Sequence, residues 1–303
     1  MHFPLRRQPK ISLSSKAQCL LEEETSRFIN DYQEHFLKGE TKPPEIGQPY
    51  LLHQPQATQG VLLVHGLMAA PEEVREWADY LYSQGYTVYA PRMDGHGTSA
   101  DDLSRRKMSE WTAAVNRGHE ILKHCCEHIV IAGFSTGAAV ALKQVIDKPD
   151  AFDALVSISA PLKFKKFSAN FAKPVNTWNK VLRQIANPVF DTKKFRKEFV
   201  TNHADNPHIN YLRCPVSSIV EIKKLMNQVQ KGLSSITIPT LVIHADKDPK
   251  VDVQSGRDIY KSIHTGNAHY REIDFHLHGI VRGDITKKVF SEVNTFLDGV
   301  YRK

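Results

Sequence analysis

Three short stretches of the chain hold side chains that could carry out nucleophilic chemistry. A serine lies between two glycines in GFSTG (133–137), aspartates follow in HADKDPKVD (244–252), and two histidines follow in FHLHGIVRGD (275–284). A serine hydroxyl is a weak nucleophile near neutral pH, so it needs a base that takes its proton and an acid that orients the base. Together the three stretches predict a serine nucleophile, a carboxylate and a histidine base.

The residues around Ser135 favour a nucleophile over a simple helix cap. An apolar run at 128–133 predicts a buried strand and 136–147 predicts a helix, so Ser135 lies at the turn between them. A sharp turn of this kind brings backbones together, and side chains at positions 133 and 137 would collide. The helix start also offers N–H groups and a partial positive charge to an oxyanion. The alternative is a structural role, in which the hydroxyl only caps the helix.

Three aspartates, Asp246, Asp248 and Asp252, are candidates for the orienting acid. We favour Asp248, which lies three residues beyond the turn at Ala245, because the residues after it fit a loop that re-enters the core. Asp246 is the alternative acid, and its other possible role is that of a turn residue that binds its own backbone.

Two histidines compete for the role of base. His278 precedes a glycine and lies shortly before the terminal helix, so we favour His278. His276 would then be a turn residue or an additional donor next to the site.

Backbone donors for an oxyanion are expected on two loops. In VLLVHGL (61–67) the glycine after His65 turns the chain, so that the Leu67 N–H can point inward beside the Thr136 N–H. Both donors are backbone groups, so neither side chain has to react. This chemistry requires no metal and no organic cofactor, and we predict none.

An alternation of apolar runs and helical patterns must position these residues. Near-continuous apolar strands between helices are typical of a mostly parallel sheet covered on both faces, which is the α/β class. The predicted strands are 61–65, 87–91, 128–133, 154–160, 240–245 and 269–274, with an additional strand at 50–54 before them. The predicted helices are 71–84, 108–124, 136–147, 252–264 and 285–301.

Two segments lie outside this alternation. Residues 1–48 form an N-terminal extension, with an amphipathic helix at 16–37 and a proline-bearing linker. A crossover between parallel strands needs only about a dozen residues, so the longer segment 161–235 predicts an inserted helical cap. The core then consists of 49–160 and 236–303.

The positive charge of the chain is concentrated in the predicted cap. The formal net charge is +7, and 161–235 holds 14 lysines and arginines against 4 aspartates and glutamates. A solvated surface is the favoured interpretation, and an anionic substrate or anionic lipid surface is the alternative. No nucleic-acid-binding signature accompanies the charge, so we expect no nucleic acid partner.

Other features bear on localisation. No window has the roughly 18–20 apolar residues that span a bilayer, so no transmembrane segment is expected. The first residues lack the apolar stretch of a secretory signal. The four cysteines have neither metal-ligand nor disulfide-framework spacing, and we interpret them as reduced thiols of a cytoplasmic protein.

From about residue 60 to its C-terminus the chain resembles the α/β-hydrolases. Within that superfamily it is similar to the bacterial carboxylesterase and monoacylglycerol-lipase branch, in which a Gly-His-Gly loop (here 95–97) and a downstream tryptophan (here Trp111) recur and a helical cap is inserted. The stretches that carry the resemblance are VLLVHGL, PRMDGHGTS, GFSTG, HADKDPKVD and HGIVRGD. Ala245 stands where the family usually has glycine.

The resemblance implies Ser135, Asp248 and His278 as the catalytic triad, with Leu67 and Thr136 as backbone oxyanion donors. It implies a serine hydrolase that cleaves small, acyl- or lipid-like carboxylic esters through an acyl-enzyme. A thioesterase or acyltransferase with the same triad, and a non-catalytic ligand-binding protein, are the alternatives.

Aromatic residues of the predicted cap could line an acyl pocket or form the cap's own core. They are Phe164, Phe167, Phe171, Trp178, Phe190, Phe195, Phe199 and Tyr211.

Overall fold

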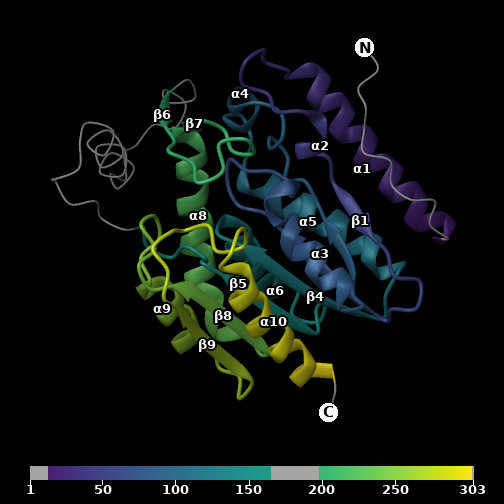
Figure 1. Cartoon of the computed structure of the whole chain (residues 1–303), viewed down its shortest axis with the longest axis vertical. Coiled ribbons are helices and arrows are strands. Elements are labelled where there is room, and N and C mark those ends of the chain that lie inside the picture. Colours follow the sequence, from purple (N-terminus) through teal and green to yellow (C-terminus); the bar gives the residue numbers. More distant parts are fainter. Residues whose placement is uncertain (1–12, 165–197, 302–303) are drawn as a thin grey trace.

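Seven strands form one central sheet in the computed structural model, which describes residues 13–164 and 198–301 (Figure 1). Their order across the sheet is β1-β3-β2-β4-β5-β8-β9. β1 runs antiparallel to β3, and the other pairings in this sheet are parallel. The strands are β1 (Tyr50–Leu52), β2 (Gln59–Val64), β3 (Thr87–Ala90), β4 (His128–Phe134), β5 (Ala154–Ile158), β8 (Thr240–Ala245) and β9 (Ala268–Ile273).

Helices cover both faces of the sheet, which confirms the predicted α/β class. One face packs against α3 (Arg75–Ser83) and α10 (Thr286–Tyr301), and the other against the remaining long helices of the core. These are α5 (Met108–Lys123), α6 (Thr136–Asp147), α8 (Val216–Gly232) and α9 (Gln254–Ser262).

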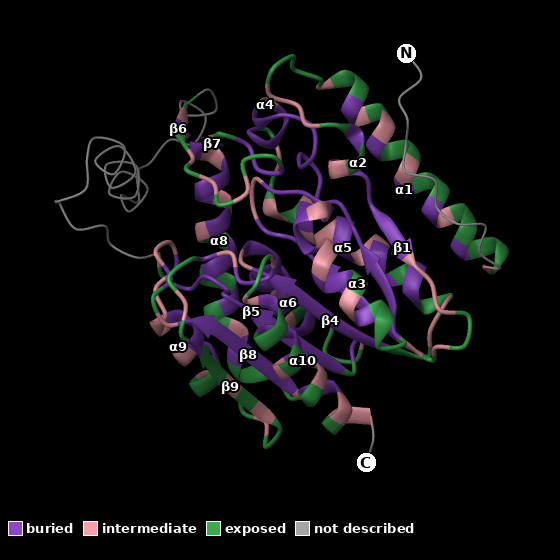
Figure 2. Cartoon of the chain, viewed as in Figure 1, coloured by how far each residue is buried: buried purple, intermediate pink, exposed green. Residues whose placement is uncertain are grey.

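The alternation of side chains along each strand explains the apolar runs. In β4, Ile129 and Ile131 enter one core and Val130 and Ala132 enter the other. Both faces are thus buried, as parallel strands require. The edge strand β9 is largely exposed, in agreement with its charged sequence (Figure 2).

The predicted strands and helices agree with the observed ones to within three residues at most ends. One difference is at 71–84, where a 3-10 turn, η1 (Pro71–Val74), precedes α3 because Pro71 occupies its first position. Another is that β5 ends at Ile158 and not at residue 160, because Ser159 has a φ of +51°. Two short helices, α2 (Pro44–Gly47) and α4 (Ala100–Leu103), were not predicted.

The N-terminal helix α1 (Ser15–Glu34) packs on the outside of α5 through both apolar and ionic contacts. Phe28 is fully buried, and the guanidinium of Arg117 in α5 lies 2.6 Å from the carboxylate of Glu24. The buried Arg92, in the loop after β3, lies 2.5 Å from Asp31. Ion pairs of this kind fix the orientation of α1, because a shifted helix would leave buried charges unpaired.

The described part of the segment 161–235 is not helical throughout. β6 (Phe199–Thr201) and β7 (Arg213–Pro215) form a separate antiparallel pair, followed by α8 and a 3-10 turn, η2 (Leu233–Ser235). α8 packs against α6 and contributes Leu225 and Val229 to the main core. The boundaries that the sequence suggests for the cap, the core and the N-terminal extension stay predictions.

Candidate active site

Ser135 lies at the sharp turn between β4 and α6. Its φ of +55° is in the left-handed region, where a residue with a side chain is strained. Its backbone N–H donates to the Ile158 carbonyl at 2.8 Å, which holds the turn against β5. The hydroxyl makes no cap hydrogen bond to α6, so it remains available for another partner.

The glycines on both sides of Ser135 are required by close backbone approaches. A Cβ on Gly137 would lie 2.2 Å from the Val64 carbonyl oxygen and 2.3 Å from that of His65. A Cβ on Gly133 would lie 2.4 Å from the Gly137 carbonyl oxygen. All three distances are far below van der Waals contact, as expected for the collision inferred from the sequence.

Ser135, His278 and Asp248 form one hydrogen-bonded chain. The Ser135 Oγ lies 2.8 Å from His278 Nε2, and His278 Nδ1 lies 2.6 Å from Asp248 Oδ2. The three residues follow β4, β9 and β8, so the carboxyl ends of three parallel strands bring them together. This is the arrangement in which a base can accept the serine proton while a carboxylate holds the imidazole.

The carboxylate of Asp248 is held in place on both oxygens. Its Oδ1 accepts hydrogen bonds from the backbone N–H groups of Lys250 at 2.7 Å and Val251 at 2.9 Å. Burial opposes ionisation of this group, but the neighbouring imidazoles of His278 and His244 outweigh burial and hold the pKa of Asp248 well below its usual range. Asp248 is therefore an anion at neutral pH.

The competing candidates lie elsewhere. Asp246 Oδ1 accepts from the Phe275 N–H at 3.0 Å, so Asp246 joins the loops after β8 and β9. Asp252 Oδ1 accepts from the Gln254 N–H at the start of α9. His276 is exposed and does not line the cavity described below.

The carbonyl of the Gly66–Leu67 peptide is held by the His65 ring, which is itself fixed at both nitrogens. His65 Nδ1 donates to the Gly66 carbonyl at 2.9 Å, and its Nε2 accepts from the Met93 N–H at 3.2 Å. Burial lowers the pKa of His65 to about 4, so the ring is neutral and its two roles are fixed. Because the peptide is trans, its N–H points away from the carbonyl that His65 binds. Leu67 and Thr136 both line the cavity with Ser135.

Glu73 holds the preceding peptide of the same loop. Its Oε2 accepts the Gly66 N–H at 2.7 Å, and its side chain is 6% exposed. Burial raises the pKa of Glu73, and the hydrogen bond from Gly66 partly offsets this effect. In the sequence, Glu73 is simply an acidic residue in a predicted helix, so nothing there distinguishes it.

The Gly-His-Gly loop and Trp111 lie behind this peptide. The rings of His65 and His96 pack edge to face at 5.0 Å between centroids, and those of His96 and Trp111 at 6.0 Å. The Tyr211 hydroxyl donates to the Gly95 carbonyl at 3.0 Å and accepts the Thr98 N–H at 2.8 Å. Tyr211 therefore anchors this loop and does not line the cavity, so of the two suggested roles the acyl pocket does not apply to it.

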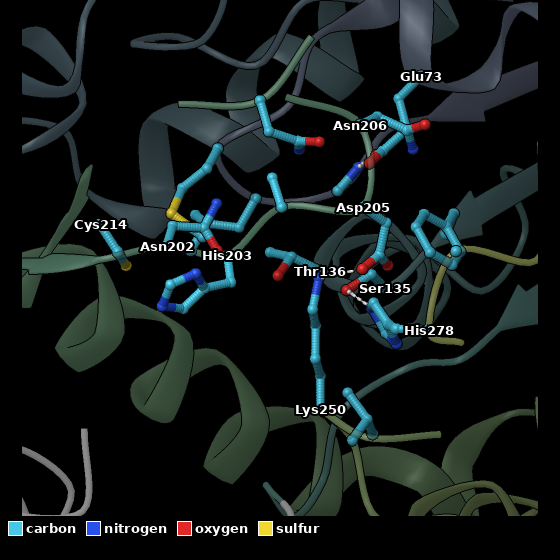
Figure 3. Close-up of a pocket in the computed structure, with 18 of the residues that line it drawn as sticks. Glu73, Ser135, Thr136, Asn202, His203, Asp205, Asn206, Cys214, Lys250 and His278 are labelled. Atoms are coloured by element: carbon cyan, nitrogen blue, oxygen red, sulfur yellow. Dashed lines mark hydrogen bonds and ion pairs between the residues drawn. The ribbon is translucent and has the colours of Figure 1, made fainter. Parts of the chain in front are cut away.

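A cavity of about 370 Å³ opens beside Ser135 and His278. Figure 3 shows the two residues together with the labelled side chains that surround them. The apolar residues of its lining are Leu67, Met68, Phe134, Phe164, Cys214, Ile222, Pro249 and Val251. The polar residues that line it besides Ser135, Thr136 and His278, here called the polar wall, are Glu73, Thr201, Asn202, His203, Asp205, Asn206, Asn210 and Lys250.

Among the aromatic residues suggested for an acyl pocket, Phe164 lines the cavity. Phe199 instead packs beneath Arg213, with the guanidinium 4.3 Å from the ring centroid. Phe167, Phe171, Trp178, Phe190 and Phe195 lie outside the described residues.

Residues 13–164 and 198–301 contain neither a candidate metal-binding cluster nor a candidate membrane-spanning helix. This part of the chain holds no group of three or more histidine, cysteine, aspartate or glutamate side chains that could bind a metal ion. It also contains no helix with the length and apolar character needed to cross a bilayer.

Known proteins were compared with this chain. A family model described as serine aminopeptidase, S33, matches residues 55–284. A thermostable monoacylglycerol lipase of Bacillus sp. (strain H-257) is 29% identical over 204 residues, which are 67% of this chain and 76% of that protein. A carboxylesterase of Bacillus subtilis (strain 168) is 25% identical over 241 residues, 79% of this chain and 92% of that protein.

Solved structures support the same fold. The monoacylglycerol lipase of Paleococcus ferrophilus superposes with a TM-score of 0.67 at 18% identity, over 83% of this chain and 98% of that one. A structure reported for LipS and LipT, two metagenome-derived lipolytic enzymes, gives a TM-score of 0.71 at 21% identity, over 87% of this chain and 99% of that one. Since the family model spans more than half of the sequence, the chain belongs to the S33 serine aminopeptidase family of α/β-hydrolases.

Proposed function

We propose that this α/β-hydrolase cleaves carboxylic esters, with Ser135 as nucleophile, His278 as general base and Asp248 as orienting acid. The observation that carries the proposal is the unbroken hydrogen-bonded chain from Ser135 Oγ through His278 to Asp248, at 2.8 and 2.6 Å, beside a cavity. The names of the relatives, a monoacylglycerol lipase and a carboxylesterase, support the same reaction class.

The reaction proceeds in two halves. Ser135 attacks the ester carbonyl while His278 takes its proton, and the Leu67 and Thr136 N–H groups stabilise the oxyanion. His278 then gives the proton to the departing alcohol, which leaves an acyl-enzyme on Ser135. Water, activated by His278, attacks this acyl group and releases the acid. Asp248 stays ionised and stabilises the imidazolium in both halves.

The residues that line the cavity suggest the kind of ester. The apolar lining residues can take an acyl chain, because they remove its apolar surface from water. The polar wall can donate hydrogen bonds to the polar groups of an alcohol and can accept hydrogen bonds from them. We therefore infer a small, lipid-like ester whose alcohol part is polar.

A thioesterase or acyltransferase acting on an anionic carrier is the main alternative. The charges on the described wall favour the ester, because Glu73 and Asp205 oppose the single cation Lys250, which itself pairs with Asp205 at 3.3 Å. An anionic carrier would gain little from this wall. Most of the basic residues of the predicted cap lie within 165–197, outside the described residues, so binding to an anionic lipid surface stays a prediction.

The decisive experiment compares hydrolysis rates for p-nitrophenyl esters and acyl-CoA thioesters of matched acyl length. We expect faster ester hydrolysis in the wild type, loss of that activity in Ser135→Ala, and unchanged activity in the control Ser83→Ala, which alters an exposed serine in α3. Full activity in Ser135→Ala would contradict the catalytic assignment, and a strong thioester preference would favour the alternative.

A further inference from the structure

A second histidine faces the acid of the proposed triad. His244 lies on β8, four residues before Asp248, and is fully buried. Its Nε2 is 3.6 Å from Asp248 Oδ2, the same oxygen that His278 contacts at 2.6 Å. Neither ring nitrogen of His244 has a hydrogen-bond partner within residues 13–164 and 198–301.

The ring of His244 is confined by its surroundings. Gly256 of α9 packs against it so closely that a Cβ there would lie 3.0 Å from His244 Nδ1 and 3.1 Å from its Cβ. Glu272 is opposite His244 in the β8–β9 ladder, and its carboxylate pairs with Arg257 of α9 at 2.6 Å. The imidazole therefore keeps one edge toward Asp248.

An imidazole whose ring nitrogens have no hydrogen-bond partner among the described residues lowers the stability of the fold when it is buried at this position. The neighbours of His244 in β8 are apolar, and a leucine there would not require two ring nitrogens to lose water. Such a group is best explained by the charge that it faces. An Nε2 lone pair directed at a carboxylate would be repelled, whereas an Nε2–H is attracted.

We propose that His244 is a positioning residue, whose Nε2–H faces Asp248 Oδ2 and shares the carboxylate charge with His278. This inference rests on the proposed function, because it assigns Asp248 to the triad. His244 does not touch the substrate and acts through Asp248 alone. Because two imidazoles share one carboxylate oxygen, Asp248 stabilises the protonated form of His278 less than it would if it faced His278 alone.

The proposal predicts the direction of a pH effect. Catalysis needs a neutral His278, so the rate falls on the acidic side as His278 becomes protonated. Without the His244 N–H, the charge of Asp248 acts on His278 alone and favours the imidazolium. The acidic midpoint of kcat/KM then moves to higher pH. A substitution at 244 leaves the neighbouring charged groups unchanged: Glu73, Asp205 and Lys250 line the cavity with His278, and the Glu272–Arg257 pair lies by His244.

The first test is the pH profile of ester hydrolysis by His244→Leu. We expect its acidic midpoint to lie about 0.5 to 1 pH unit above that of the wild type, the size expected for the loss of one N–H that faces a carboxylate. His244→Gln keeps an N–H donor at a similar reach and should return the midpoint toward the wild-type value. Ile259→Val, which only loosens the packing of α9, should not move it. An unchanged midpoint in His244→Leu would overturn the proposal.

The second test uses the wild-type protein and needs neither a variant that folds nor turnover. In a 15N spectrum of histidine-labelled protein at neutral pH, we expect a proton on Nε2 of His244. An Nε2 of His244 without a proton would overturn the proposal, because that nitrogen would then present a lone pair, and no N–H, to Asp248. Full activity in Ser135→Ala would instead contradict the proposed function, and the spectrum would still decide the state of His244.

Discussion

The floor of the cavity and its polar wall are built in different ways. The floor consists of Ser135, Asp248 and His278, which lie just beyond the carboxyl ends of the sheet strands β4, β8 and β9 and are joined by hydrogen bonds. The polar wall comes mainly from the stretch 201–210, which begins at the last residue of the short strand β6, and joins the floor at Glu73. The groups proposed to react thus lie next to the ends of sheet strands, and most groups of the polar wall lie on a loop, as is common for enzymes. Changes in the floor should therefore affect the chemical step, and changes in the wall should affect selectivity.

The largest effect is expected at the acid of the floor. Asp248→Asn keeps the shape but removes the charge and the correct imidazole orientation, so kcat should fall by about 10⁴-fold. Asp246→Asn is the matched control and should keep kcat within about threefold, because the Asp246 side chain contacts the Phe275 N–H and Lys247 and is not part of the chain from Ser135 to Asp248. The hydrolysis rates of one p-nitrophenyl ester give kcat for both variants. Equal losses in the two variants would mean that Asp248 has no special role.

The next effect concerns the turn that carries Ser135. Gly137→Ala places a methyl group against the Val64 and His65 carbonyls and should lower the free energy of unfolding by about 3 kcal/mol. Gly299→Ala in α10 meets nothing within 4 Å and should be neutral or stabilising. Urea unfolding measures both variants. A Gly137→Ala protein as stable as the wild type would show that the turn has room to relax.

A change of similar size in the free energy of unfolding is expected from pH, through His65, which binds the Gly66 carbonyl in the loop that carries Leu67. The unfolded chain protonates His65 near pH 6.5, but burial keeps it neutral in the folded protein down to about pH 4. The folded state thus binds fewer protons in this range, so its stability falls as the pH drops from 6.5 toward 4, by about 3 kcal/mol from this group.

Urea unfolding at pH 7 and pH 4.5 can isolate this contribution. His65→Asn has no titrating ring, so it should lose less stability between the two pH values than the wild type. The same loss in both proteins would place the effect in other groups.

The smallest effect is expected where the wall meets the floor. Glu73→Gln removes the charge that accepts the Gly66 N–H, so the loop carrying Leu67 loosens and kcat falls by about tenfold. The KM for a p-nitrophenyl ester should stay within about threefold. Glu72→Gln at the neighbouring half-buried position is the control and should change neither constant. A rise in KM with unchanged kcat would place Glu73 among the groups that bind the ligand.

The difference between floor and wall also explains what could be read from the sequence. GFSTG is largely a local pattern, since the clash at position 133 arises within the turn itself, although the clash at 137 is with the Val64 and His65 carbonyls at the end of β2. Asp248 could be located because it follows a strand with a clear apolar run, and His278 because it lies between the last predicted strand and the terminal helix. The alternation of strands and helices likewise predicted all seven sheet strands with ends within two residues of the observed ones, although β1 and β5 each end two residues early, β5 at the strained Ser159.

The wall depends on contacts between distant segments, which leave no local signal. Glu73 meets Gly66 only because η1 folds back over β2, and Tyr211 binds Gly95 across 116 positions of sequence. The same is true of His244, which is an ordinary strand residue until β8, α9 and the Asp248 loop pack together.

The central claim is that ester cleavage passes through Ser135, and titration with a serine-directed fluorophosphonate tests it most directly. The account predicts one mass addition, on Ser135, and a loss of ester hydrolysis in proportion to the fraction of Ser135 modified. Hydrolysis that persists when Ser135 is fully modified, or modification at another residue that abolishes it, would contradict the account.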